Sequence, residues 1–268
     1  MRCVSYDIEL VSGNMIYIEP LGDMHIGSLG FDEQKLLSRI EVIKKDRNRY
    51  WIGMGDYIDA ISPWKKGYID KRFDEAVYRS DYPTISRQIE KFISLVKPIS
   101  RKCLGLLWGN HEWDKMEQED FVRDFCSPLG VPFLGSRCFV NLNIKKKGRL
   151  LGNWWIFAIH GKWGGERKGG AINKFDLLPR FIDADIYLMA HTHIKAVMPE
   201  SRIVPVFRDG KVEIVEKDLI FAFTGGFLKQ YVIGEDTYMD KAGFPKNFRT
   251  GTITVGIDPE RGKLHGFD

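Results

Sequence analysis

The sequence lacks long hydrophobic runs. No stretch of about eighteen uncharged apolar residues, the length that a membrane-spanning helix needs, occurs in the chain. The segment Met1 to Asp7 also lacks the apolar run of a secretory signal. We therefore expect no membrane association and a cytoplasmic location. Internal repeats, heptads and low-complexity tracts are missing too, and no obvious linker divides the chain, so we expect a single domain over residues 1–268.

Cysteine is scarce. The four cysteines stand at positions 3, 103, 126 and 138 and show no paired CxxC spacing. This spacing excludes a zinc ribbon, and a disulfide scaffold is disfavoured in a chain of this size. We expect free thiols, most of them buried.

Apolar residues are plentiful and the charge is nearly balanced. Hydrophobic residues make up 44% of the chain, with seven Trp and seventeen Phe, which is enough for a substantial core. The formal net charge is +4 and the pI is about 8.7. This mildly basic balance permits a polyanionic partner without demonstrating one.

Short apolar segments predict β-strands, and they alternate with helical patterns in the first half of the chain. Residues 4–10 and 15–20 flank a turn sequence and indicate a β-hairpin. Helical spacing is found in residues 31–46 and again in residues 83–97. Further helices are expected over residues 115–126 and 171–182, a second hairpin over residues 137–159, and mainly strands from residue 185 onward. This order fits an α/β protein with mixed sheets.

Side chains that can bind metal ions follow five of the predicted strands. They are Asp23, His25, Asp56, Asn110, His160, His191 and His193. In α/β sheets, ligand sites gather at the carboxyl ends of strands, so we expect these side chains to meet at one rim. Nitrogen and oxygen ligands without a thiolate suit Mn²⁺, Fe, Zn²⁺ or Co²⁺ better than a calcium cage or a structural zinc site.

Each pattern taken alone has an ordinary explanation. The segment around Asp23 and His25 can be a turn with a polar tip, and Asp59 can be a helix cap. Asn110 and His111 are common loop residues. Five of the six histidines, however, lie directly after a predicted apolar strand or two residues beyond it, with only His265 elsewhere.

The ordered set resembles the calcineurin-like metallophosphoesterase superfamily, whose signature is Asp-x-His, Gly-Asp-x-x-Asp, Gly-Asn-His-Asp/Glu, His and Gly-His-x-His. The matching segments are Asp23-Met24-His25, Gly55-Asp56-Tyr57-Ile58-Asp59, Gly109-Asn110-His111-Glu112, His160-Gly161 and Ala190-His191-Thr192-His193. Each motif is common by itself, but five in this order are specific. The resemblance extends from about residue 16 to residue 195.

The resemblance implies a sandwich of two mixed β-sheets with helices on both outer faces, and a phosphoesterase with two divalent metal ions. Mn²⁺ is the expected metal, with Fe, Zn²⁺, Co²⁺ or Mg²⁺ as alternatives. One ion would be held by Asp23, His25 and His193, the other by Asn110, His160 and His191, and Asp56 would bridge them. His111 would act as a cation or proton donor beside the leaving oxygen, oriented by Asp59.

Two positions depart from the superfamily pattern. Ala190 replaces the usual glycine of the last motif, which leaves metal binding intact but can tilt the loop. Ala60 stands where the protein phosphatases of the superfamily carry a phosphate-binding arginine. Protein phosphatase activity is therefore disfavoured.

Three segments bear on the substrate. Residues 61–81 interleave cations and aromatics, which fits either an insertion that faces the substrate or a solvated excursion with a small core of its own. The glycine-rich loop after His160 offers Lys162, Arg167 and Lys168 as substrate contacts. The loop-rich segment 225–250 has a similar composition but no assigned role. Together they favour a phosphodiester substrate in DNA, RNA or a nucleotide.

Other functions remain open on the sequence alone. The chain could be a phosphomonoesterase or a small-molecule phosphodiesterase, whose cations would bind a terminal phosphate. It could also be a non-catalytic scaffold with the same fold, although such a protein would be expected to have lost ligands. The sequence predicts no oligomeric state.

Overall fold

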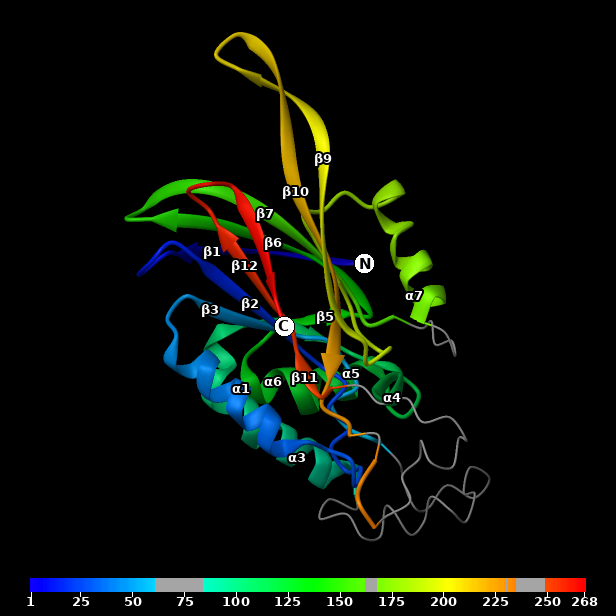
Figure 1. The fold of residues 1–268 in the computed structure, drawn as a ribbon. Coiled ribbons are helices and arrows are strands. Elements are labelled where there is room, and N and C mark those ends of the chain that lie inside the picture. The colour runs from blue at the N-terminus through cyan, green and yellow to red at the C-terminus, as the bar shows by residue number, and fades with distance from the viewer. Residues whose placement is uncertain (61–83, 162–167, 230, 235–248) are drawn as a thin grey trace.

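The computed structural model describes residues 1–60, 84–161, 168–229, 231–234 and 249–268. In this part of the chain, two β-sheets lie face to face (Figure 1). The first sheet has the strand order β1-β6-β7-β8-β10-β11, with β9 paired to β10. Its strands are β1 (Arg2–Glu9), β6 (Arg137–Lys146), β7 (Arg149–Ile159), β8 (Ile186–Met189), β9 (Lys195–Arg208), β10 (Lys211–Gly226) and β11 (Gly251–Thr252).

The second sheet has the order β13-β12-β2-β3-β4-β5. Its strands are β2 (Ile16–Leu21), β3 (Arg49–Gly53), β4 (Cys103–Leu107), β5 (Phe133–Gly135), β12 (Thr254–Asp258) and β13 (Lys263–Phe267). Strands β2 to β5 run parallel, whereas β12 is antiparallel to both β2 and β13. The first sheet combines both pairings as well, so both sheets are mixed.

Three apolar clusters define the layers. Ile18, Val140 and Ile220 belong to the core between the two sheets. Helices α1 (Glu33–Lys45) and α3 (Ile85–Val96) cover the outer face of the second sheet, and α7 (Lys168–Phe175) covers the outer face of the first (Figure 1). The predicted fold class, two mixed sheets with helices on both outer faces, is confirmed.

The remaining helical segments are short and follow α3, β4 and α7. They are η1 (Lys97–Lys102), α4 (Asn110–Trp113), α5 (Gln118–Phe121), the π-helical turn η2 (Val122–Cys126), α6 (Ser127–Leu129) and η3 (Leu178–Arg180). The helix over residues 83–97 is confirmed as α3, with Thr84 accepting a hydrogen bond from the backbone of Arg87 at its start. No helix in the described residues is long and apolar enough to cross a membrane.

The predicted hairpin of the first two strands is wrong. β1 pairs in parallel with β6 of the first sheet, and β2 pairs with β3 and β12 of the second. Asn48 holds the connection, because its side chain bonds the backbone of both Val11 and Ser12. The turn therefore carries the chain from one sheet to the other. The hairpin over residues 137–159 is confirmed as β6 and β7.

Strands β9 and β10 extend well beyond their sheet as a two-stranded arm (Figure 1). Their pairing continues to Arg208 and Lys211 at the tip. Apolar side chains on the arm are exposed, with Ile203 and Ile214 each 77% accessible. The part of β10 that lies within the sheet is buried, since Ile220 is fully inaccessible.

The cysteines are free, as expected: Cys103, Cys126 and Cys138 are buried, and Cys3 is exposed.

Candidate metal centre

Both sheets contribute side chains to one cluster at the carboxyl ends of their strands. The second sheet places Asp23 and His25 after β2, Asp56 after β3 and Asn110 after β4. The first sheet places His160 after β7, and His191 and His193 after β8. All seven predicted ligands are thus brought together where the two sheets meet, although they span most of the sequence.

The backbone at these positions is strained. Five residues of the cluster adopt the left-handed conformation with positive φ, which non-glycine residues rarely do: Asp23 (47°), His25 (49°), Asp56 (51°), His191 (67°) and His193 (55°). Such conformations cost free energy and persist only where the surroundings impose them.

Hydrogen bonds between loops impose this conformation. The N–H of Asp23 donates to the carbonyl of Gly55 over 2.9 Å. The N–H groups of Met24 and His25 donate to the backbone carbonyl of Asp56 over 2.8 and 3.1 Å. From the first sheet, the N–H of Phe227 donates to the carbonyl of Asp23 over 2.8 Å. The loops after β2, β3 and β10 therefore form one hydrogen-bonded unit.

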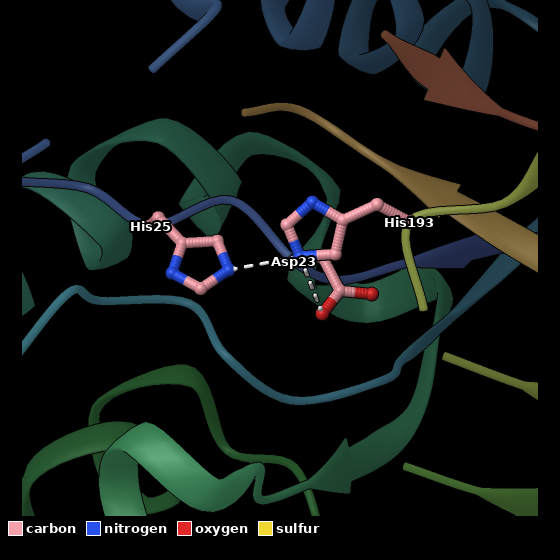
Figure 2. Close-up of side chains that lie close together, drawn as sticks. All are labelled: Asp23, His25 and His193. Atoms are coloured by element: carbon pink, nitrogen blue, oxygen red, sulfur yellow. Dashed lines mark hydrogen bonds and ion pairs between the residues drawn. The ribbon is translucent and has the colours of Figure 1, made fainter. Parts of the chain in front are cut away.

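The first group of side chains that could hold a cation is Asp23, His25 and His193. Figure 2 shows the two imidazoles facing each other with the carboxylate below them. The Nε2 atoms of His25 and His193 are 3.2 Å apart, and Nε2 of His193 lies 3.6 Å from Oδ1 of Asp23. Oδ1 of Asp23 is buried without a hydrogen-bond partner. A buried, unpartnered carboxylate oxygen that converges with two imidazole nitrogens fits a cation.

The second group is Asp56, His160 and His191, with Asn110 beside it. Nε2 of His160 lies 3.3 Å from Oδ2 of Asp56 and 3.1 Å from the side-chain oxygen of Asn110. Nδ1 of His160 donates to the carbonyl of Met54 over 2.7 Å, which leaves Nε2 as the free ligand atom. The N–H of His191 bonds Oδ2 of Asp23 over 2.9 Å and so ties the two groups together.

Asp56 lies between the two groups. Its Oδ2 is 3.3 Å from His160 and 4.0 Å from Nε2 of His25, while its Oδ1 accepts a hydrogen bond from the N–H of His111 over 3.0 Å. The side chain is almost completely buried. One carboxylate is therefore within reach of both sets of ligands.

His111 forms a third group with His25 and Asp56, in which one atom of each side chain lies within 4.8 Å of the others. Its side chain is 29% exposed, whereas that of His160 is inaccessible. Nδ1 of His111 donates to the carbonyl of Asp59 over 2.7 Å, and the Asp59 carboxylate is farther away, at 3.7 Å. That carboxylate lies closer to Nδ1 of His25, at 3.4 Å. Asp59 thus holds the His111 ring chiefly through its backbone.

Glu112 has a role that the sequence analysis did not assign. Its fully buried carboxylate accepts four backbone hydrogen bonds, from Asp56, Tyr57, Ile58 and Gly109, over 2.7 to 3.2 Å. These bonds join the loop after β3 to the loop after β4. The signal for this role in the sequence was the acidic residue at the end of the Gly-Asn-His-Glu motif.

Without bound cations, the pKa values of Asp23 and His160 are raised, which favours their protonated forms. Burial and the charge of Asp56 raise the pKa of Asp23 to about 8. Burial alone would lower the pKa of His160, but Asp56 and Asp23 raise it to about 9. Burial and the neighbouring His160 lower the pKa of His191 to about 4. A metal ion must displace the protons on Asp23 and His160, so binding is expected to weaken at low pH.

The predicted substrate contacts are only partly described. Lys162 and Arg167 lie outside the described residues, as does the segment 61–81. Lys168 is the first residue of α7. Of the segment 225–250, the described residues include the end of β10 and Phe227, whose N–H bonds the carbonyl of Asp23.

Comparison with known proteins gives matches in structure alone. No family model and no curated protein matches the sequence. A predicted phosphoesterase from Streptococcus pneumoniae is 13% identical, with a TM-score of 0.38 over 92% of this chain and 86% of the other. A double mutant of Vps29 from Entamoeba histolytica is 13% identical, with a TM-score of 0.40 over 94% and 97%.

A metallophosphoesterase from Sphaerobacter thermophilus is also 13% identical, with a TM-score of 0.37 over 94% of this chain and 87% of the other. TM-scores of this size do not assign a function. Two of the three names are those of phosphoesterases.

Proposed function

We propose that this chain is a dinuclear metal-dependent phosphoesterase that hydrolyses phosphodiester bonds. The observation that carries the proposal is the position of Asp56, whose single carboxylate lies between His25 of the first group and His160 of the second. Asp23, His25 and His193 would hold one ion, and Asn110, His160 and His191 the other. Carboxylate, amide oxygen and imidazole ligands without a thiolate suit Mn²⁺, Fe, Zn²⁺ or Co²⁺, and Mn²⁺ is the metal that we propose among these.

Two divalent cations, when bound, neutralise phosphate oxygens and lower the pKa of water, which supplies the attacking group. The chain itself positions these ions, and it supplies a proton through His111. The Nδ1 of His111 is held by the carbonyl of Asp59, which leaves Nε2 for the leaving oxygen of the substrate. Asp56 and Asp59 raise the pKa of His111 against the effect of burial, and this favours the protonated donor.

The proposed substrate is a nucleic acid or a nucleotide. Support comes from the basic and aromatic composition of residues 61–81 and 225–250, because cations bind a phosphate backbone and aromatics stack on bases. A phosphomonoester or a small diester is the second candidate, and a non-catalytic scaffold is the third. The complete set of ligands and the accessible His111 favour an enzyme over a scaffold.

The test combines metal content with turnover. The full chain is loaded with Mn²⁺ and assayed on bis(p-nitrophenyl) phosphate, p-nitrophenyl phosphate, single-stranded DNA and RNA. His111→Ala should keep both ions, and its turnover on a diester with a poor leaving group should be about 10²- to 10⁴-fold lower than that of the wild-type chain. His265→Ala is the matched control, because this exposed histidine lies on β13, away from the cluster.

Loss of metal from His111→Ala would show that this residue is a ligand rather than a proton donor. A metal-loaded chain without turnover on any of these esters would support the scaffold alternative.

A further inference from the structure

The described part of the chain encloses a cavity of about 1010 Å³. It is lined by side chains from α1, from the start of β9 and from the segments that follow β10 and precede β11. Among them are Lys35, Lys195, Lys229, Tyr231 and Arg249. We call this cavity the basic channel.

The wall of the basic channel is continuous with the first group of ligands. Lys195 follows His193 by two residues, and Lys229 follows Phe227, whose N–H bonds the carbonyl of Asp23. Gly226 packs so closely on the cluster that a Cβ there would lie 2.8 Å from the Cβ of Asp23. The same two segments therefore hold the ligands and form the channel.

Positive charge predominates in this lining. Four cations face one carboxylate, that of Asp268, which pairs with Lys195 over 2.5 Å. Lys229 lies 3.4 Å from Asp32 at the start of α1. Lys35 and Arg249 have no carboxylate partner among the residues that the structure describes. The lining holds more cations than one phosphate group needs, and they are spread over a large cavity. The channel therefore fits a ligand with several phosphates.

The channel also carries an exposed aromatic ring. Tyr231 is 57% accessible, whereas buried aromatic side chains account for much of the core. An accessible tyrosine among cations is the combination that binds single-stranded nucleic acid, because an unpaired base can stack on the ring while the cations contact its backbone.

We propose that the basic channel binds a single-stranded nucleic acid and delivers its backbone to the metal centre, with Lys35, Lys195, Lys229 and Arg249 contacting phosphates and Tyr231 stacking on a base. This inference rests on the proposed function, because it assigns the substrate that the centre would cleave. It also predicts a direction, since the strand would reach the cluster from the side of Asp23 and His193.

Binding is measured apart from turnover. The full chain in EDTA is titrated with a fluorescein-labelled single-stranded 12-mer at several salt concentrations, and fluorescence anisotropy gives the affinity. The double variant Lys35→Ala/Arg249→Ala should bind about tenfold more weakly. The slope of its plot of log affinity against log salt concentration should be smaller in magnitude by about 1.4, which is about 0.7 for each phosphate that the variant no longer neutralises. Tyr231→Phe should retain binding, and Tyr231→Ala should weaken it.

The matched control is Lys44→Ala/Lys45→Ala, which removes the same charge from the exposed end of α1. This control should keep the salt slope of the wild-type chain. Equal slopes for the two double variants would overturn the channel, and equal affinity of the wild-type chain for a duplex of the same sequence would overturn the single-strand assignment. Hydrolysis of bis(p-nitrophenyl) phosphate by the Mn²⁺-loaded chain tests the proposed function separately. The binding result can therefore contradict the channel without contradicting the phosphoesterase activity.

Discussion

At the scale of single residues, the carboxylate of Glu112 fixes the geometry of the centre without facing a metal position. Its four backbone donors hold the loop after β3, which carries Asp56, against the loop after β4, which carries Asn110. A buried N–H group without an acceptor costs about 1–3 kcal/mol. Removal of this one side chain therefore affects both ligand loops.

Glu112→Ala is expected to lower the free energy of unfolding by about 4 kcal/mol or more, because several buried donors lose their acceptor together. Metal affinity should fall in the same variant, since the loop of Asp56 is released. Chemical denaturation of the metal-free chain measures the first effect, and metal content after gel filtration measures the second.

Glu112→Gln is the graded control. An amide keeps one acceptor oxygen and turns an NH₂ group toward the remaining donors, so it should destabilise the chain less than alanine does. Wild-type stability of the alanine variant would contradict the role assigned to Glu112.

Asp56→Ala tests the shared carboxylate. If Asp56 bridges two ions, its removal should empty or scramble both positions, whereas loss of a ligand of one ion should spare the other. His193→Ala is the comparison, because His193 belongs to the first group alone. Metal analysis of the two variants separates these outcomes, and two tightly bound ions in Asp56→Ala would rule out bridging.

The sequence located the candidate ligands because each follows an apolar strand, and the structure brings all seven together. The role of Glu112 could not be predicted in the same way. Three of its four donors lie more than fifty positions away, and only the folded chain places them around the carboxylate. Similarly, the motif named Asp59 as the partner of His111, but it could not show that the nearer contact is the carbonyl.

At the scale of elements, strand β10 combines two environments. Its outer half belongs to the exposed arm, and its inner half lies between β8 and β9 in the sheet. Ile214 is 77% exposed and Ile220 is inaccessible. Two isoleucines on one strand therefore provide a direct measure of what burial contributes to stability.

Ile220→Ala should cost about 2–5 kcal/mol of unfolding free energy, because it removes buried methyl groups and leaves a cavity. Ile214→Ala should change stability by no more than about 0.5 kcal/mol, since its side chain is already in water. Urea denaturation of both variants measures the difference. A comparable loss in Ile214→Ala would show that the arm is covered in solution.

Strand positions were predictable from apolar runs, whereas strand partners were not. The turn after β1 resembles a hairpin turn, but Ile8 and Leu10 are buried in the core between the sheets, and β1 pairs with β6 more than a hundred positions away. Apolar periodicity reports which side of a strand is buried, and it carries no information about the neighbouring strand.

At the scale of the whole molecule, the proposed ions would join the two sheets. Asp23, His25, Asp56 and Asn110 come from the second sheet, and His160, His191 and His193 come from the first. The first group already combines ligands from both sheets, as does the second. Cation binding would therefore resist separation of the sheets as well as support chemistry.

Removal of metal should accordingly lower the melting temperature of the entire chain. A ligand that binds only the folded state adds about 2.7 kcal/mol at a hundred times its dissociation constant, which corresponds to roughly 5–10 °C for a chain of this length. Differential scanning calorimetry with excess Mn²⁺ and then with EDTA measures this shift. In Asp56→Ala the same addition of EDTA should change the melting temperature little, because the shared ligand is missing. An equal shift in both proteins would mean that the cations stabilise the chain from somewhere other than this cluster.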